Sequence, residues 1–190
     1  MRNRHSVLRL LLVVVVAVTT FWIVRRTFSP STLSEPSSVA DSSQALVGPA
    51  DIYPNSLRTP GATNPDITQS NIGETICNPM WSTKSIRPPT TYTHHLKVEQ
   101  IREFGYADTS PKDYEEDHLI PLELGGDPTD PKNIWPEPIE TSIPDGGARF
   151  KDKVENHLHA QVCAGNLTLE EAQKEISTDW YRVYTMWVRH

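Results

Sequence analysis

The sequence predicts a single α+β domain with flanking helices. Two short apolar segments, within residues 114–122 and 133–135, have the length and composition of β-strands. Two later segments repeat apolar residues at the spacing of amphipathic helices. A domain usually takes about 100 to 200 residues, so the 190-residue chain allows one domain with additional segments.

The N-terminal segment, residues 1–26, has the pattern of a membrane anchor or a signal peptide. Leu10–Val24 carries no charge and has arginines on both sides. A membrane-spanning helix usually needs about 20 apolar residues, and a signal-peptide core about 7 to 15. Bulky Phe21 and Trp22 stand where a cleavage site requires small residues. We therefore expect an uncleaved single-pass anchor with the domain outside the cytoplasm, and a cleaved signal of a secreted protein is the alternative.

The rest of the chain divides by composition into a stalk and a domain. Residues 27–70 are rich in Ser, Thr and Pro without a sustained period, which predicts a flexible stalk. The alternative for Tyr53-Pro54 and Arg58-Thr59-Pro60-Gly61 is an extended arm that docks on the domain. Residues 71–190, the predicted domain, hold twelve basic and twenty acidic residues, a net charge of −8. This balance argues against a protein that binds nucleic acid through phosphate neutralisation alone. It leaves room for an enzyme whose carboxylates hold a divalent cation.

The first half of the domain is expected to contain one helix and one strand. The spacing of apolar residues predicts a helix over residues 92–104, and Gly105 is a suitable end for it. Residues 114–122 then read as a strand. On an ideal strand His118 faces one side and Asp117 the other.

The second half is expected to contain a short strand and two helices. The strand covers residues 133–135, and prolines keep the chain irregular until a helix starts near Ala148 and ends at Gly165. Thr168 and Glu171 form a capping box that opens the last helix. The expected buried stripes are Phe150, Val154, Leu158 and Val162 in the first helix and Ala172, Ile176, Trp180, Tyr184 and Trp187 in the second.

The two cysteines, Cys77 and Cys163, are predicted to form a disulfide. They lie 86 residues apart, and an export segment places an even cysteine count in an oxidising compartment. A pair of free buried thiols is the alternative in a cytosolic protein. Asn166 begins an Asn-Leu-Thr sequon and is a candidate glycosylation site if the domain is exported.

The run from Tyr114 to Gly126 is the segment most suited to chemistry. It places Asp117 and His118 side by side on an apolar strand that ends at Pro and Gly-Gly, and Asn133 opens the next apolar stretch. A neutral imidazole can accept a proton from water near pH 7, which makes His118 a candidate general base. The alternative is a strand-edge acid beside a structural histidine, and Asn133 can equally be a structural turn amide.

Strand, glycine turn, strand and helix in this order resemble the ββα-metal nucleases, in particular the HNH endonuclease-like family. The resemblance covers about residues 76–184. The residues that carry it are Trp81, Arg87-Pro88-Pro89, Asp117-His118-Leu119-Ile120-Pro121-Leu122-Glu123-Leu124-Gly125-Gly126, Asn133-Ile134-Trp135-Pro136 and the helix from Lys151-Asp152 to His159.

The resemblance implies metal-dependent hydrolysis of a phosphodiester bond in DNA or RNA. His118 would act as general base, and Asn133 would orient the loop or His118 through its amide. Asp117 would hold a divalent cation on the scissile phosphate, which requires a twist or bulge that brings it to the side of His118. Mg²⁺ suits oxygen ligands, and Mn²⁺ or Zn²⁺ suits a mixed site.

The helical metal ligand departs from the family pattern, because residues 146–149 offer neither His nor Asn. Glu155 and His159, four residues apart on the predicted helix, are the candidates in its place. Arg149 or Lys151 is expected to contact phosphate directly.

Two other functions are compatible with the sequence. A non-catalytic extracytoplasmic module that kept the fold would explain the acidic charge and the missing helical ligand. A metal that serves only stability is the third possibility. The expected partners are nucleic acid and, through the N-terminal segment, a membrane, and no protein partner is predicted.

Overall fold

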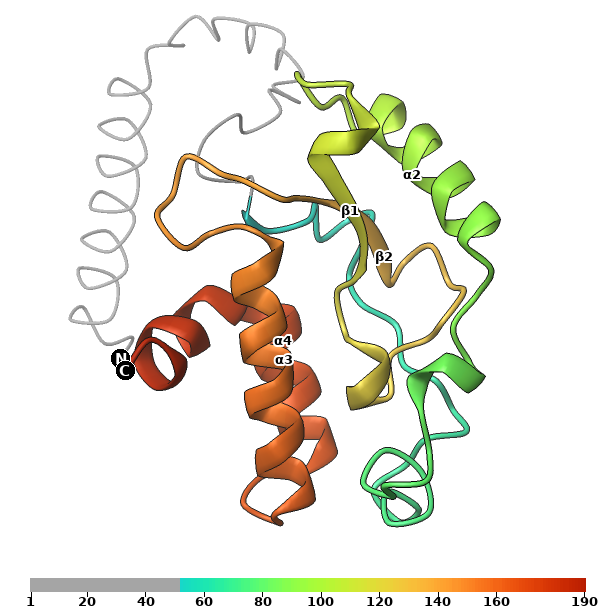
Figure 1. Ribbon diagram of the computed structural model, residues 1–190, viewed down its shortest axis with the longest axis vertical. Helices are drawn as coiled ribbons and strands as arrows, with labels where there is room; N and C mark the ends of the chain where they lie inside the picture. The colour runs from blue at the N-terminus through green and yellow to red at the C-terminus, as the bar shows by residue number, and fades with distance from the viewer. Residues whose placement is uncertain (1–51) are drawn as a thin grey trace, which may run out of the picture. The chain divides into compact units, whose positions relative to one another are not determined.

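The computed structural model describes residues 52–190, and this part of the chain has an α+β fold (Figure 1). Its principal elements are α2 (Thr90–Glu103), β1 (Tyr114–His118), β2 (Ile134–Pro138), α3 (Ala148–Cys163) and α4 (Leu169–Val183). The described residues therefore contain three α-helices and one two-stranded sheet, which confirms the predicted α+β class.

The two strands form an antiparallel hairpin, and every residue of β2 is buried. β1 ends at His118, before the predicted end at Leu122. Pro121, which has no amide N–H to pair, and the 3-10 helix η4 (Leu122–Leu124) follow it and turn the chain. The turn places His118 at the end of the hairpin, where a side chain can face a site.

Helix α2 lies beside the hairpin, on the side away from α3 and α4 (Figure 1). Gln100 Nε2 donates to the Ile134 carbonyl at 2.9 Å, and Lys97 Nζ donates to the Tyr114 carbonyl at 2.9 Å. Gly105, with φ of +75°, follows the helix, so the predicted helix and its end are confirmed.

Helices α3 and α4 pack against each other and bury most of the predicted stripes. Thr168 caps α4 in a complete capping box with Glu171, as predicted. Gly147 precedes α3, which begins at Ala148. The buried stripe residues are Val154, Leu158 and Val162 in α3 and Ala172, Ile176, Trp180 and Tyr184 near or within α4.

The last turn of the chain departs from the predicted stripe. Asp179 has non-helical dihedrals, and the chain after Val183 forms a π-helical segment, η5 (Tyr184–Val188). A π-turn adds a residue to the helical period and rotates the following side chains. Trp187 is consequently 63% exposed, and its predicted burial is wrong.

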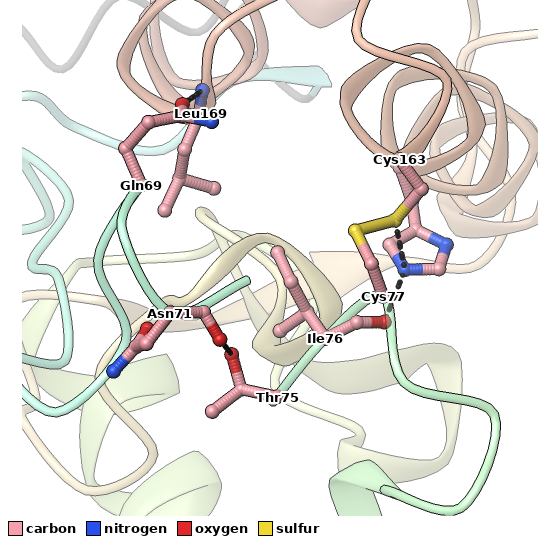
Figure 2. Close-up of a disulfide and its surroundings, with 8 residues drawn as sticks. Gln69, Asn71, Thr75, Ile76, Cys77, Cys163 and Leu169 are labelled. Carbon is pink, nitrogen blue, oxygen red and sulfur yellow. Dashed lines mark hydrogen bonds between the residues drawn. A yellow bond between two sulfur atoms is a disulfide. The ribbon is translucent and has the colours of Figure 1, made fainter. Parts of the chain in front are cut away.

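Residues 52–70, which we expected in the stalk, belong to the folded unit. Ile52 and Ile67 are buried in the hydrophobic core, and Thr63 forms a β-bridge with Gly126. Gln69 Oε1 accepts from the Leu169 amide at 2.6 Å at the start of α4 (Figure 2). The predicted domain boundary at residue 71 is therefore wrong. Isolated apolar residues such as Ile52 and Ile67 are buried in the core although prolines interrupt this segment.

The predicted disulfide between Cys77 and Cys163 is present, with the two Cα atoms 5.4 Å apart (Figure 2). It joins the segment that follows Ile72 to the C-terminal end of α3. The bond therefore fastens the irregular N-terminal part of the domain to the helical pair.

The predicted anchor (residues 1–26) and the predicted stalk up to residue 51 lie outside the described residues. Between residues 52 and 190, none of the helices has the length and apolar character needed to cross a membrane.

Candidate functional site

His118, the candidate general base, is the last residue of β1 and only 4% exposed. Its Nε2 lies 3.1 Å from the carbonyl oxygen of Pro128. A carbonyl only accepts hydrogen bonds, so Nε2 carries the proton of the neutral ring and Nδ1 carries the lone pair. Among residues 52–190 no group hydrogen-bonds to Nδ1, which leaves this atom available to a water molecule.

The surroundings of His118 keep the imidazole neutral at pH 7. Burial lowers its pKa below the ordinary value of 6.5, although Asp117 and the Pro128 carbonyl act in the opposite direction. The Arg87 guanidinium lowers the pKa further. A histidine with this pKa and this tautomer can accept a proton over the physiological pH range.

Asn133 is fully buried, and both ends of its side-chain amide hold the turn at Gly125 and Gly126, called the glycine turn below. Its Nδ2 donates to the carbonyls of Ile120 at 2.9 Å and Asp127 at 3.0 Å. Its Oδ1 accepts from the amide of Ile120 at 3.0 Å. The amide therefore fixes the loop that leads to Pro128, whose carbonyl orients His118. Asn133 is placed as a positioning residue, because its hydrogen bonds leave no atom directed at a substrate.

Gly126 permits this close packing of the turn. A Cβ on Gly126 would lie 1.7 Å from the Ile120 carbonyl oxygen and 2.8 Å from Asn133 Nδ2. Any other amino acid at position 126 would therefore push the turn away from Asn133.

Asp117 faces α3, where it meets a fully buried lysine. Lys151 Nζ lies 2.6 Å from Asp117 Oδ2, 2.5 Å from Glu155 Oε1 and 3.0 Å from the His118 carbonyl oxygen. We expected Lys151 to contact phosphate, and its burial shows that this prediction is wrong. The ammonium spends its three donors inside the protein, where a solvent-borne phosphate does not reach.

A second buried acid stands near this group. Glu137 on β2 is 1% exposed, and burial raises its pKa well above 4.5, with a further increase from Asp117. Burial lowers the pKa of Lys151, but Asp117 and Glu155 raise it more strongly, so the ammonium stays charged. Burial therefore favours the protonated form of Glu137, while the Lys151 ammonium contacts the carboxyl groups of Asp117 and Glu155.

The predicted metal-ligand set, Asp117, Glu155 and His159, is brought together only in part. Asp117 and Glu155 meet, but on the ammonium of Lys151. His159 lies farther along α3, where its Nε2 is 2.8 Å from the Ile76 carbonyl and 3.5 Å from Cys163 Sγ. A divalent cation between Asp117 and Glu155 would have to occupy the position of a buried ammonium, so these residues do not fit a metal at this point.

Two site residues had no role assigned from the sequence. Arg87 is exposed and acts electrostatically on both His118 and Glu123. Glu123, in the glycine turn, has a buried Oε1 without a hydrogen-bond partner, and burial raises its pKa. Arg87 stands in the Arg-Pro-Pro string that contributes to the family resemblance, which was the available signal. No spacing rule connects it to His118.

The remaining predicted residues lie at the surface. Arg149 is exposed in the first turn of α3, open to a phosphate. Asn166 is exposed between α3 and α4, and its Nδ2 donates to Gln161 Oε1 at 2.8 Å.

Comparisons with protein-family models, with curated proteins and with solved structures found no match to this chain.

Proposed function

We propose that the chain hydrolyses phosphodiester bonds of nucleic acid, with His118 as general base. In this proposal β1, β2 and α3 form a ββα core of the HNH type, and the glycine turn between the strands shapes the site. The order of the elements and the resemblance of residues 114–136 support this interpretation.

One observation carries the proposal, namely the hydrogen bond between His118 Nε2 and the Pro128 carbonyl. It selects the tautomer whose Nδ1 can accept a proton, and burial keeps the ring neutral at pH 7. Asn133 maintains the loop that makes this arrangement possible.

The chemistry requires proton removal, charge neutralisation and a leaving group. Water would lose a proton to His118 Nδ1 while its oxygen forms the new bond to phosphorus. The bond from phosphorus to the leaving oxygen breaks, and that oxygen takes a proton from solvent. The exposed guanidinium of Arg87 is the nearby cation suited to bind a phosphate oxygen, and Arg149 is a second candidate on α3.

No step of this scheme passes through a metal ion. Asp117 and Glu155, two of the three residues expected to hold a divalent cation, are instead paired with the ammonium of Lys151. The scheme thus differs from the metal-dependent mechanism that the family resemblance implies.

The proposed location of the domain is outside the cytoplasm, anchored through residues 1–26 or secreted. The Cys77–Cys163 disulfide supports this location, because such bonds persist in oxidising compartments.

A cleavage assay with the full-length protein tests the proposed activity. Single- and double-stranded DNA and RNA are incubated with wild type, with His118→Ala and with His95→Ala, each with and without a chelator. His95 is an exposed histidine on α2, paired with Glu99, and serves as the matched control. We expect His118→Ala to lower the rate by about 10²- to 10⁴-fold, the usual contribution of a general base, and His95→Ala to leave it unchanged. Absence of cleavage, or equal rates for wild type and His118→Ala, would reject the proposal.

The second candidate is a non-catalytic binding or structural module. The buried group formed by Lys151, Asp117 and Glu155 favours it, because these side chains pair with one another and leave none of their charges for a reaction. Nucleic-acid binding without cleavage, equal in wild type and His118→Ala, would support this function.

A further inference from the structure

Lys151 occupies a position that is built like a cation site. Its Nζ has three N–H donors, and the structure gives it three oxygen acceptors: Asp117 Oδ2, Glu155 Oε1 and the His118 carbonyl. The lysine side chain is 1% exposed, so solvent does not share in this arrangement. Two carboxylates and one carbonyl around one point are the oxygen ligands that Mg²⁺, Ca²⁺ and Mn²⁺ prefer.

The lysine is attached to the element that, by the family resemblance, would supply a metal ligand. It lies in the first turns of α3 and reaches back to β1, while Glu155 stands one helical turn farther on the same face. The ammonium therefore bridges helix and strand, as a metal ion bound to both elements would.

We propose that the Lys151 ammonium is a built-in cation that replaces a divalent ion between Asp117 and Glu155. The Lys151 ammonium and a divalent ion exclude each other, because both would occupy the same point between the two acids. Wild type accordingly binds no divalent cation there, and removal of the lysine side chain creates an oxygen-ligand metal site. This inference holds whether or not the chain cleaves nucleic acid.

Removal of the Lys151 side chain changes the charge balance of the buried group. Without Lys151, Asp117 and Glu155 face each other across a buried space with no positive charge, which destabilises the fold. Alanine at position 151 leaves room for an ion, whereas methionine fills the space with an apolar chain of similar length. The pair of variants separates loss of charge from creation of a site.

The test measures metal binding by the full-length protein. Thermal unfolding is followed in wild type, Lys151→Ala and Lys151→Met with a chelator and with increasing Mn²⁺, Mg²⁺ or Ca²⁺. Mn²⁺ binding is also followed by electron paramagnetic resonance. We expect Tm to fall in both variants, and Mn²⁺ to raise Tm in a dose-dependent way for Lys151→Ala only. Adding Asp117→Asn to Lys151→Ala should abolish that rise.

A control in wild type keeps the proposal falsifiable if Lys151→Ala does not fold. Mn²⁺ binding by wild type should be unchanged by Asp117→Asn, because surface acids account for any binding that occurs. Wild-type Mn²⁺ binding that disappears in Asp117→Asn would overturn the proposal. A folded Lys151→Ala that gains no more stability from Mn²⁺ than Lys151→Met would also overturn it. Both readouts are independent of nuclease activity, so their failure is distinguishable from failure of the proposed function.

Discussion

At the residue scale, burial acts on two basic side chains, His118 at the end of β1 and Lys151 on α3, and their neighbours determine their charge. Burial lowers the pKa of both Lys151 and His118. Asp117 and Glu155 outweigh this effect at Lys151, which remains charged. At His118 the opposing effects of Asp117 and the Pro128 carbonyl are too weak, and the imidazole is neutral. A buried cation on α3 therefore donates to the backbone carbonyl of His118, the residue whose imidazole is the neutral base.

The lowered pKa of His118 predicts the pH dependence of cleavage. A general base works when neutral, so kcat/KM should be constant near pH 7 and fall as pH drops through a pKa below 6.5. Arg87 lowers this pKa, so Arg87→Ala should move the fall to higher pH, while the exposed Arg102→Ala on α2 should not. A pH–rate profile from pH 5 to 8 measures both effects. A rate that still rises above pH 7 in wild type would assign the base to another group.

Gly126 predicts a severe effect of a single methyl group. Gly126→Ala places a Cβ on the Ile120 carbonyl and should destabilise the fold by at least about 2 kcal/mol, in the range of overpacked cores. Gly73→Ala is the control, because nothing lies within 4 Å of a Cβ there. Urea unfolding of both variants measures the difference, and equal midpoints would show that the glycine turn can relax.

At the element scale, α4 has a strong local start signal and a kink near its C-terminal end. The capping box of Thr168 and Glu171 fixes the start of α4 with hydrogen bonds that the local sequence supplies. At the kink, Asp179 makes one distant and one local contact. Its carboxylate accepts from Tyr53 Oη and from the Arg182 amide, which starts the following turn. The capping box was predictable from spacing, whereas the contact between Tyr53 and Asp179 joins residues 126 positions apart.

Removal of the Thr168 cap predicts a modest loss of stability. Thr168→Ala deletes the hydroxyl that accepts from the Glu171 amide, and such caps contribute about 1 kcal/mol. Thr91→Ala, at an exposed position of α2, is the control. Chemical denaturation monitored by circular dichroism gives the two free energies of unfolding. A Thr168→Ala protein as stable as Thr91→Ala would mean that packing alone holds the start of α4.

At the scale of the whole described domain, long-range links compensate for limited regular structure. Residues 52–70 have no long helix or strand, yet Ile52 and Ile67 complete the core and the Ile52 carbonyl accepts from Trp180 Nε1 at 2.7 Å. The Cys77–Cys163 disulfide adds a covalent link between the irregular segment and α3. The domain is therefore held by contacts between segments distant in sequence.

Reduction of the disulfide should lower the free energy of unfolding by about 4 to 5 kcal/mol in the chain-entropy model for a loop of 86 residues. Urea unfolding of the full-length protein with and without dithiothreitol measures this change. A double variant, Cys77→Ser with Cys163→Ser, should match the reduced protein and be insensitive to dithiothreitol. Equal stability of oxidised and reduced wild type would contradict the prediction.

Local signals in the sequence were enough to predict several elements of the fold. Period and caps predicted α2, α3 and α4, and composition with an export segment predicted the disulfide. The pairing of Asp117 with His118 in one run identified the candidate base. These features depend on residues close in sequence, or on a pair of cysteines with one possible partner each.

Which charged side chains meet depends on how the elements pack against one another. Lys151 read as a phosphate ligand, and Glu155 and His159 as metal ligands, because one helix presents them at neighbouring positions. The packing of α3 against the end of β1 buries Lys151 between Asp117 and Glu155, while His159 points to the Ile76 carbonyl. Spacing along a helix predicts the direction in which a side chain points. The depth of its burial and the identity of the side chain opposite it depend on how the elements pack.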